Sequence, residues 1–230
     1  MKKIIHLTDL HIGFNGLETR LNDIVNNICK RETPAGDYVI VITGDLVEDA
    51  TQSGSYYKVT PYLDRLKAKG FTVLVIPGNH DYGTGTSGKI EYVSKFKKCF
   101  FGDSYENTNP FYPILGQPPE FGLIGNIAFI GLDSMEAAVN TKNELEATRF
   151  AAEGKLGDAQ LERLAKMLKT NDKVKNAVYT VVYLHHHPIY WLPGMLLVDA
   201  DKLKSTLLDS NHKIDAFLFG HKHKSKPLDG

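Results

Sequence analysis

The sequence predicts a mixed, layered α/β fold, and two patterns carry this prediction. Short β-branched apolar runs alternate with segments whose apolar residues recur at helical spacing, as in successive β–α units. The middle of the chain is instead rich in expected strands, which favours mixed rather than purely parallel sheets. The 230 residues contain no internal repeat and no low-complexity linker, so we expect a single domain over residues 1–230.

The first part of the chain is expected to alternate strands with helices. Residues 38–42 are almost wholly apolar, which is typical of a strand buried on both faces of a parallel sheet. Gly70 ends the second helical pattern, and Pro61 within it is a candidate kink. The expected strands are 3–7, 38–42 and 71–76, and the expected helices are 17–28, 56–66 and 90–100.

The sequence pattern changes after residue 102. Residues 102–122 contain four of the ten prolines and show little apolar periodicity. This stretch is expected to be a loop with one strand near 111–115. A turn at Gly125-Asn126 predicts an antiparallel hairpin, and Asp158 is a candidate N-cap. The remaining expected elements are strands 121–124, 127–132, 177–184 and 214–219 and helices 156–168 and 201–208.

Composition excludes several classes of protein. The 27 Lys+Arg balance 27 Asp+Glu, so affinity for nucleic acid through a broad cationic face is not expected. Two isolated cysteines, Cys29 and Cys99, make no disulfide framework and favour reduced thiols in the cytoplasm. No apolar run reaches the roughly 18 residues of a membrane span, and polar residues from His6 onward interrupt a signal peptide.

Five polar clusters of metal-binding residue types follow the expected strands. They are Asp9-Leu10-His11, Gly44-Asp45, Gly78-Asn79-His80-Asp81, His185-His186-His187-Pro188 and Gly220-His221-Lys222-His223. Each cluster alone is equally compatible with an ordinary turn. Ligands bind at the carboxyl ends of strands in α/β sheets, however, and five turns of this composition favour a shared site. If these segments are extended, Asp-x-His and His-x-His each direct two side chains to the same side.

The residue types restrict the metal. Imidazole, carboxylate and one amide oxygen, without any thiolate, suit Mn, Fe, Zn, Co or Ni. About seven ligands exceed one tetrahedral site and indicate two divalent ions sharing a carboxylate, as in two-metal hydrolases.

In this order, Asp-x-His, Gly-Asp, Gly-Asn-His-Asp, His-x-Pro and Gly-His-x-His resemble the motifs of the calcineurin-like metallophosphoesterases. The resemblance extends from Asp9 to His223. Within the family, the chain is most similar to the cyclic-nucleotide and glycerophosphodiester phosphodiesterase branch. It implies a four-layer αββα sandwich with a dinuclear site at its rim. The chain ends seven residues after His223, so further strands that complete the second sheet in this family are expected to be missing or replaced.

The resemblance also implies a role for each motif residue. Ligands of the first ion would be Asp9, His11 and His223, ligands of the second would be Asn79, His186 and His221, and Asp45 would bridge the two. The His-x-Pro register selects His186 among the three histidines. His80 would be the catalytic histidine and Asp81 the carboxylate that orients it. Glu48 stands where this branch often has Asp.

The expected activity is hydrolysis of a phosphodiester, either a small diester or a cyclic nucleotide. Two divalent ions (Mn, Fe or Zn, or a mixed pair) would supply a bridging hydroxide near neutral pH, and His80 would assist the leaving alkoxide. Two alternatives stay open: a nuclease of the same superfamily, and a non-catalytic scaffold that binds a protein. The expected partner is a small phosphoester rather than nucleic acid, in the cytoplasm, with a homodimer left open as the oligomeric state.

Overall fold

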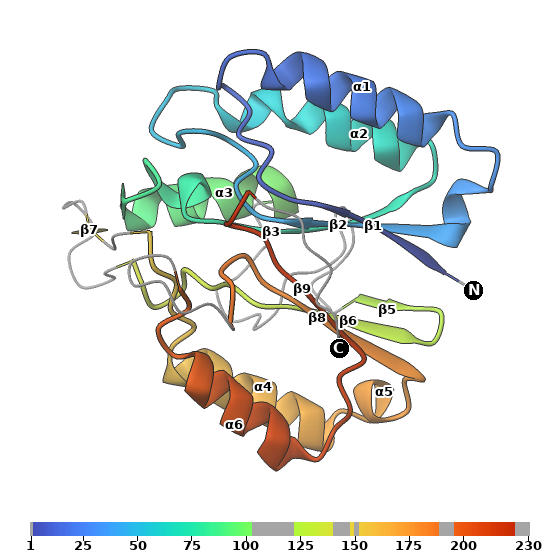
Figure 1. Ribbon diagram of the computed structural model, residues 1–230, viewed down its shortest axis with the longest axis vertical. Coiled ribbons are helices and arrows are strands. Elements are labelled where there is room, and N and C mark those ends of the chain that lie inside the picture. Colours follow the sequence, from blue (N-terminus) through green and yellow to red (C-terminus); the bar gives the residue numbers. More distant parts are fainter. Residues whose placement is uncertain (1, 103–121, 140–147, 150–151, 189–195, 224–230) are drawn as a thin grey trace.

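The computed structural model describes residues 2–102, 122–139, 148–149, 152–188 and 196–223. It confirms an α/β fold with two mostly parallel sheets and helices outside them (Figure 1). The strand expected near 111–115 lies outside the described residues. Across the part of the chain that the structure describes, none of the helices combines the length and apolar composition that crossing a membrane requires.

The first sheet is wholly parallel, with the strand order β1-β2-β3. Its strands are β1 (Lys3–Leu7), β2 (Tyr38–Thr43) and β3 (Thr72–Ile76). All six residues of β2 are buried, as the apolar run predicted, because β2 is the central strand and is covered on both faces. Helices α1 (Leu17–Cys29) and α2 (Thr60–Ala68) cover the outer face of this sheet (Figure 1).

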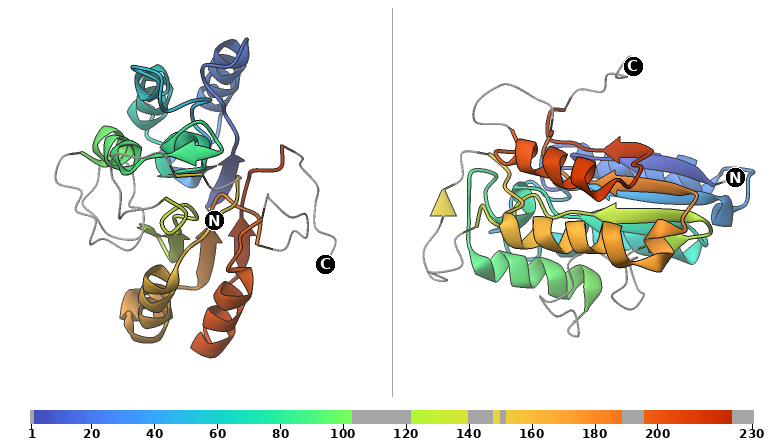
Figure 2. Two further views of the ribbon diagram at one scale, coloured as in Figure 1. Left: turned by 90° about the vertical axis from the view of Figure 1, so that its left-hand side faces the viewer. Right: turned by 90° about the horizontal axis from the view of Figure 1, so that it is seen from below.

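The second sheet has the order β5-β6-β8-β9, in which only the β5–β6 hairpin is antiparallel. Its strands are β5 (Gly122–Ile124), β6 (Ile127–Gly131), β8 (Tyr179–Tyr183) and β9 (Ala216–Leu218). Helices α4 (Asp158–Thr170) and α6 (Ala200–Ser210) run side by side along its outer face (Figure 2). The short helix α5 (Asp172–Lys175) leads into β8.

Between the sheets lies one apolar core, built from β-branched and aromatic side chains of both. Helix α3 (Ile90–Phe101) closes this core beside β3, where Phe96 packs edge-on against Tyr82 at 5.8 Å between ring centroids. The smaller elements are η1 (Ala35–Asp37), η2 (Tyr56–Lys58), η3 (His80–Tyr82) and the paired strands β4 (Ser87–Gly88) and β7 (Thr148–Arg149).

Two local expectations were wrong. Pro61 does not kink a helix, because α2 begins at Thr60 and places the proline in its first turn, where a missing N–H costs nothing. Asp158 does not cap α4. It is the first helical residue, and its carboxylate pairs with Lys202 at 2.6 Å. No described side chain caps α4. The N–H groups of Leu156 and Gly157, the two residues before the helix, donate to the buried carboxylate of Asp199 at 3.1 and 2.8 Å.

This difference gives a test of what anchors α4. Replacing Asp199 with Ala leaves the N–H groups of Leu156 and Gly157 without their acceptor, which should lower the free energy of unfolding by about 1–3 kcal/mol. Asp158→Ala is the matched control and should leave the urea midpoint almost unchanged, because its ion pair with Lys202 is exposed. Equal destabilisation by both variants in urea unfolding would contradict this assignment.

Candidate metal centre and active site

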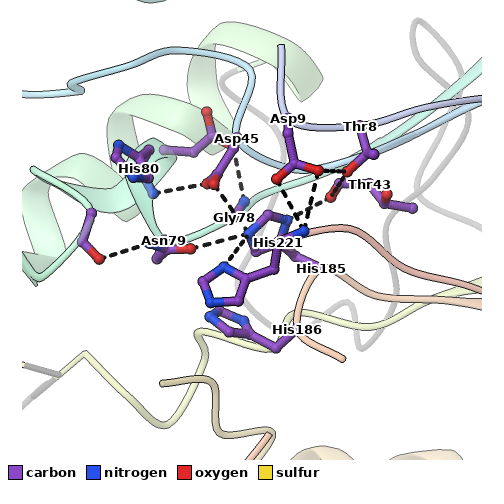
Figure 3. A network of polar contacts seen from close by, with 12 residues as sticks. Thr8, Asp9, Thr43, Asp45, Gly78, Asn79, His80, His185, His186 and His221 are labelled. Atoms are coloured by element: carbon purple, nitrogen blue, oxygen red, sulfur yellow. Dashed lines mark hydrogen bonds and ion pairs between the residues drawn. The ribbon is translucent and has the colours of Figure 1, made fainter. Parts of the chain in front are cut away.

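The polar clusters meet where the carboxyl ends of the two sheets face each other. Within the first sheet, the Asp9 N–H donates to Gly44 C=O at 3.2 Å and the His11 N–H donates to Asp45 C=O at 2.9 Å. Between the sheets, the His221 N–H donates to the Asp9 carboxylate at 3.0 Å (Figure 3). Backbone hydrogen bonds thus hold the loops after β1 and β2 together, and His221 joins the second sheet to them.

The backbone at these loops is left-handed rather than extended. The φ angles at the motif residues are positive: 52° at Asp9, 44° at His11, 51° at Asp45, 75° at His221 and 51° at His223. The expectation that Asp-x-His and His-x-His project as in a strand is therefore wrong. Side chains other than glycine adopt this conformation at a cost of about 1–3 kcal/mol each, and such strain concentrates at functional sites.

One cluster of ligand atoms combines Asp9, His11, Asp45 and His223, and these atoms all lie within 4.8 Å of one another. His11 Nε2 lies 3.0 Å from His223 Nε2 and 3.7 Å from Asp45 Oδ2. His223 Nε2 lies 3.5 Å from Asp9 Oδ1. The structure thus brings together the three residues predicted for the first ion and the predicted bridging carboxylate.

A second cluster combines His185, His186 and His221, all buried. His185 Nε2 lies 3.0 Å from Asn79 Oδ1, 3.1 Å from His221 Nδ1 and 3.2 Å from Asp45 Oδ2. In the same cluster, His186 Nδ1 is bonded to Ser134 Oγ at 2.8 Å, and its ring stacks on His221 with centroids 4.4 Å apart. His185, rather than the predicted His186, therefore lies among Asp45, Asn79 and His221 (Figure 3).

Asp45 lies between the two clusters and is 1% exposed. Burial by itself raises the pKa of this carboxyl, but the neighbouring His185, His80 and His11 outweigh it and hold the pKa below its usual range. Burial likewise lowers the pKa of His185, and the opposing charge of Asp45 raises it to about 9. Asp45 is therefore an anion at neutral pH, and in the metal-free protein His185 is its cationic partner.

The donor set fits transition-metal ions. Among the described residues, His186 Nε2 and His221 Nε2 are buried without a hydrogen-bond partner, although buried polar atoms normally have one. His185 Nε2 faces three potential ligand atoms, and a single N–H at this nitrogen can donate a hydrogen bond to only one of them. Imidazoles with carboxylates and an amide oxygen are the ligands that Mn, Fe and Zn accept.

Two glycines allow these groups to approach. A Cβ atom at Gly78 would lie 2.2 Å from Asp45 Oδ1, and one at Gly44 would lie 2.7 Å from His185 Nδ1. Any side chain at either position would displace a predicted or candidate ligand. Only glycine leaves enough space at these positions of the Gly-Asp and Gly-Asn-His-Asp motifs. At Gly44, the φ angle of 84° also favours glycine.

His80 is oriented by a different residue from the one predicted. Its Nδ1 lies 2.6 Å from the backbone oxygen of Glu48. The Asp81 carboxylate instead accepts backbone N–H groups of Leu46, Val47 and Gly78 at 2.8–3.2 Å, so its predicted role in orienting the His80 ring is wrong. Burial, followed by the charge of Asp45, raises the pKa of Asp81 to about 7.

Sequence reasoning missed Ser134, which bonds His186, and gave Glu48 no role. Asp133-Ser134 lies one residue beyond the end of β6, much as the recognised clusters follow their strands, so its position after a strand was a usable signal. The Glu48 contacts depend on the turn after β2 and have no such signal.

Comparison with known proteins identifies a family and a distant relative. The model of the calcineurin-like phosphoesterase family matches residues 2–225. A probable cyclic nucleotide phosphodiesterase of Vesicomyosocius okutanii subsp. Calyptogena okutanii (strain HA) is 26% identical over 228 residues, which cover 96% of this chain and 78% of the relative.

The triple histidine can be resolved by substitution. The sequence register selects His186, but the contacts of His185 with Asn79 and Asp45 lead us to expect that His185→Ala removes one ion per chain. His186→Ala should retain both ions, since the His186 ring lies against the rings of His185 and His221 while its Nδ1 is bonded to Ser134. Metal content of folded, manganese-loaded variants measures this, and loss of an ion only in His186→Ala would restore the sequence register.

Proton release gives a second test. An ion needs the neutral imidazole of His185, whose pKa is raised to about 9, whereas burial lowers the pKa of His11, of His186 and, to about 3, of His221. Between pH 7 and 8.5 one proton should therefore leave as an ion enters, and the affinity should rise about tenfold per pH unit. Calorimetry in buffers of different ionisation enthalpy measures the release; a value of zero contradicts the His185 assignment.

Proposed function

The chain belongs to the calcineurin-like phosphoesterase family of metal-dependent phosphoesterases, and we propose that it hydrolyses a small phosphodiester or a cyclic nucleotide. The observation that carries the proposal is the position of Asp45, whose carboxylate lies beside both the His11–His223 cluster and the His185–His221 cluster. The proposal extends to a four-layer αββα sandwich formed by a single domain over residues 1–230.

We assign the ligands from these contacts. Asp9, His11 and His223 would hold one ion, Asn79, His185 and His221 the other, and Asp45 would be shared. Two bound divalent ions, drawn from Mn, Fe and Zn, would supply a water of lowered pKa and positive charge for the phosphate oxygens. The buried Nε2 of His221, which has no hydrogen-bond partner, supports the presence of an ion at this site.

His80 is positioned to exchange a proton with the leaving group. The Glu48 carbonyl can only accept, so the neutral His80 ring carries its proton on Nδ1 and leaves Nε2 with a lone pair. Once protonated, Nε2 can donate to a departing alkoxide. Gly85 leaves room at this nitrogen, since a Cβ atom there would lie 2.4 Å from Nε2. The backbone N–H of His80 also donates to Asp45 Oδ1 at 3.0 Å, so the histidine is hydrogen-bonded to the proposed shared ligand.

Two observations favour a small diester over duplex DNA. The relative is named as a probable cyclic nucleotide phosphodiesterase, and the equal numbers of acidic and basic residues provide no excess of cations for a DNA backbone. The non-catalytic alternative is disfavoured because the ligand residues and His80 are all present and converge.

The direct experiment is a substrate panel on manganese-loaded protein: bis(p-nitrophenyl) phosphate, a 3′,5′-cyclic nucleotide, a glycerophosphodiester and duplex DNA at moderate salt. We expect turnover of the small diesters that chelation abolishes and added Mn²⁺ restores. Cleavage of DNA without any small-diester activity would favour the nuclease. Absence of turnover in protein that carries two ions would favour the scaffold.

Substitution of His80 separates proton transfer from metal binding. His80→Ala should retain both ions, because its ring is bonded to Glu48 C=O and belongs to neither proposed ligand set. The kcat/KM for a glycerol or ribose leaving group should fall by roughly 10²–10⁴-fold, and that for nitrophenolate should fall much less.

A suitable control is His212→Ala, since His212 Nε2 bonds Thr180 Oγ1 away from the site, and it should leave kcat/KM unchanged. An equal loss for both leaving groups in His80→Ala would refute a general-acid role, and loss of an ion would make His80 a ligand.

A further inference from the structure

Glu48 contacts two histidines of the proposed site through different atoms. Its Oε2 lies 2.8 Å from His11 Nδ1, and its backbone oxygen lies 2.6 Å from His80 Nδ1. We propose that the Glu48 carboxylate is a positioning residue that orients His11 toward the first ion; this rests on the proposed function insofar as that ion serves catalysis.

The two ring nitrogens of His11 face different groups: Nδ1 faces Glu48, and Nε2 faces His223 and Asp45. A carboxylate at Nδ1 selects the tautomer with its proton on Nδ1 and makes the other nitrogen more basic. That other nitrogen, Nε2, faces His223 Nε2 at 3.0 Å and Asp45 Oδ2 at 3.7 Å. The lone pair that a metal ion requires is thereby aimed into the cluster of Asp9, His11, Asp45 and His223.

Two backbone hydrogen bonds to Ile12 fix the segment that carries Glu48. The Glu48 N–H donates to Ile12 C=O at 3.0 Å, and the Ile12 N–H donates to Leu46 C=O at 3.0 Å. Residues 46–48 therefore run alongside the residue that follows His11, and the carboxylate reaches His11 without crossing the site. The Glu48 side chain is 35% exposed and the His11 side chain is 8% exposed, so the carboxylate reaches from the rim to a buried ring.

His11, Glu48 and His80 also form a third group of ligand-type atoms within 4.8 Å of one another. A third ion there would need Nδ1 of His11 and the carboxylate that now bonds it, while Nε2 of the same ring binds the first ion. The 2.8 Å contact has the length of a charge-assisted hydrogen bond, which favours positioning over a third site. The stoichiometry of binding distinguishes the two.

The chain permits a clean variant, because Glu48→Ala removes the carboxylate but keeps the carbonyl that orients His80. We expect the dissociation constant of the first ion to rise 10–100-fold and that of the second to stay unchanged. Glu48→Gln retains a neutral acceptor for Nδ1 and should give an intermediate loss. The control is Asp49→Ala, whose carboxylate bonds Thr51 instead and should leave both ions unaffected.

Two measurements that need no turnover decide the matter. Manganese titration by calorimetry identifies the first ion by its loss in His223→Ala, and in that background Glu48→Ala should have no further effect. Nitrogen NMR of the metal-free protein should show His11 protonated on Nδ1 in the wild type and as a mixture of tautomers in Glu48→Ala.

The inference is overturned if Glu48→Ala leaves first-ion affinity and the His11 tautomer unchanged, if both ions weaken together with the melting temperature, or if the wild type binds a third ion that the variant lacks. Because neither measurement uses a substrate, failure of the substrate panel would refute the proposed function alone.

Discussion

The site depends on burying one carboxylate. Asp45 is 1% exposed, and an ionised carboxylate in such a position costs several kcal/mol unless charges and donors surround it. It obtains them from both sheets: the His80 N–H and His11 come from the first, and His185 comes from the second. Each of these partners follows the end of a different strand, so the contacts of Asp45 depend on the relative positions of those strands.

The same constraint explains where the backbone is strained. Five motif residues, Asp45 among them, have left-handed φ angles, and the side chains of the other four lie in the two clusters beside Asp45. Strain of this kind persists only where the surroundings determine the conformation. The wholly buried β2 and the backbone hydrogen bonds of Asp9 and His11 supply that support. The Asp81 carboxylate adds to it by accepting three N–H groups of the loops around Asp45, so its contribution is to the backbone rather than to the His80 ring.

A second buried network connects the two sheets beside the metal centre. The Tyr82 hydroxyl, two residues beyond His80, donates to Asp133 Oδ2 at 2.7 Å. Gln160 on α4 then bonds both the N–H and the C=O of Asp133 at 2.8 Å. The neighbouring Ser134 bonds His186, so the loop after β6 positions a histidine as well as linking the sheets. The hydrogen bonds among Tyr82, Asp133 and Gln160 pair buried polar groups with one another, and such pairing makes a local structure rigid.

The sequence by itself predicted the α/β class, the described strands and α-helices other than β4, β7 and α5, and five clusters of candidate site residues, because apolar periodicity and ligand chemistry are local properties. Only the tertiary structure decided which histidine of the triplet faces Asp45, since His185 meets Asn79 from 106 residues away. It also decided that the His80 ring bonds the Glu48 carbonyl, and that Asp199 accepts the N–H groups of Leu156 and Gly157 just before α4. The physical reason is common to all three: each contact joins residues at least 32 positions apart in the sequence, so no local pattern specifies it.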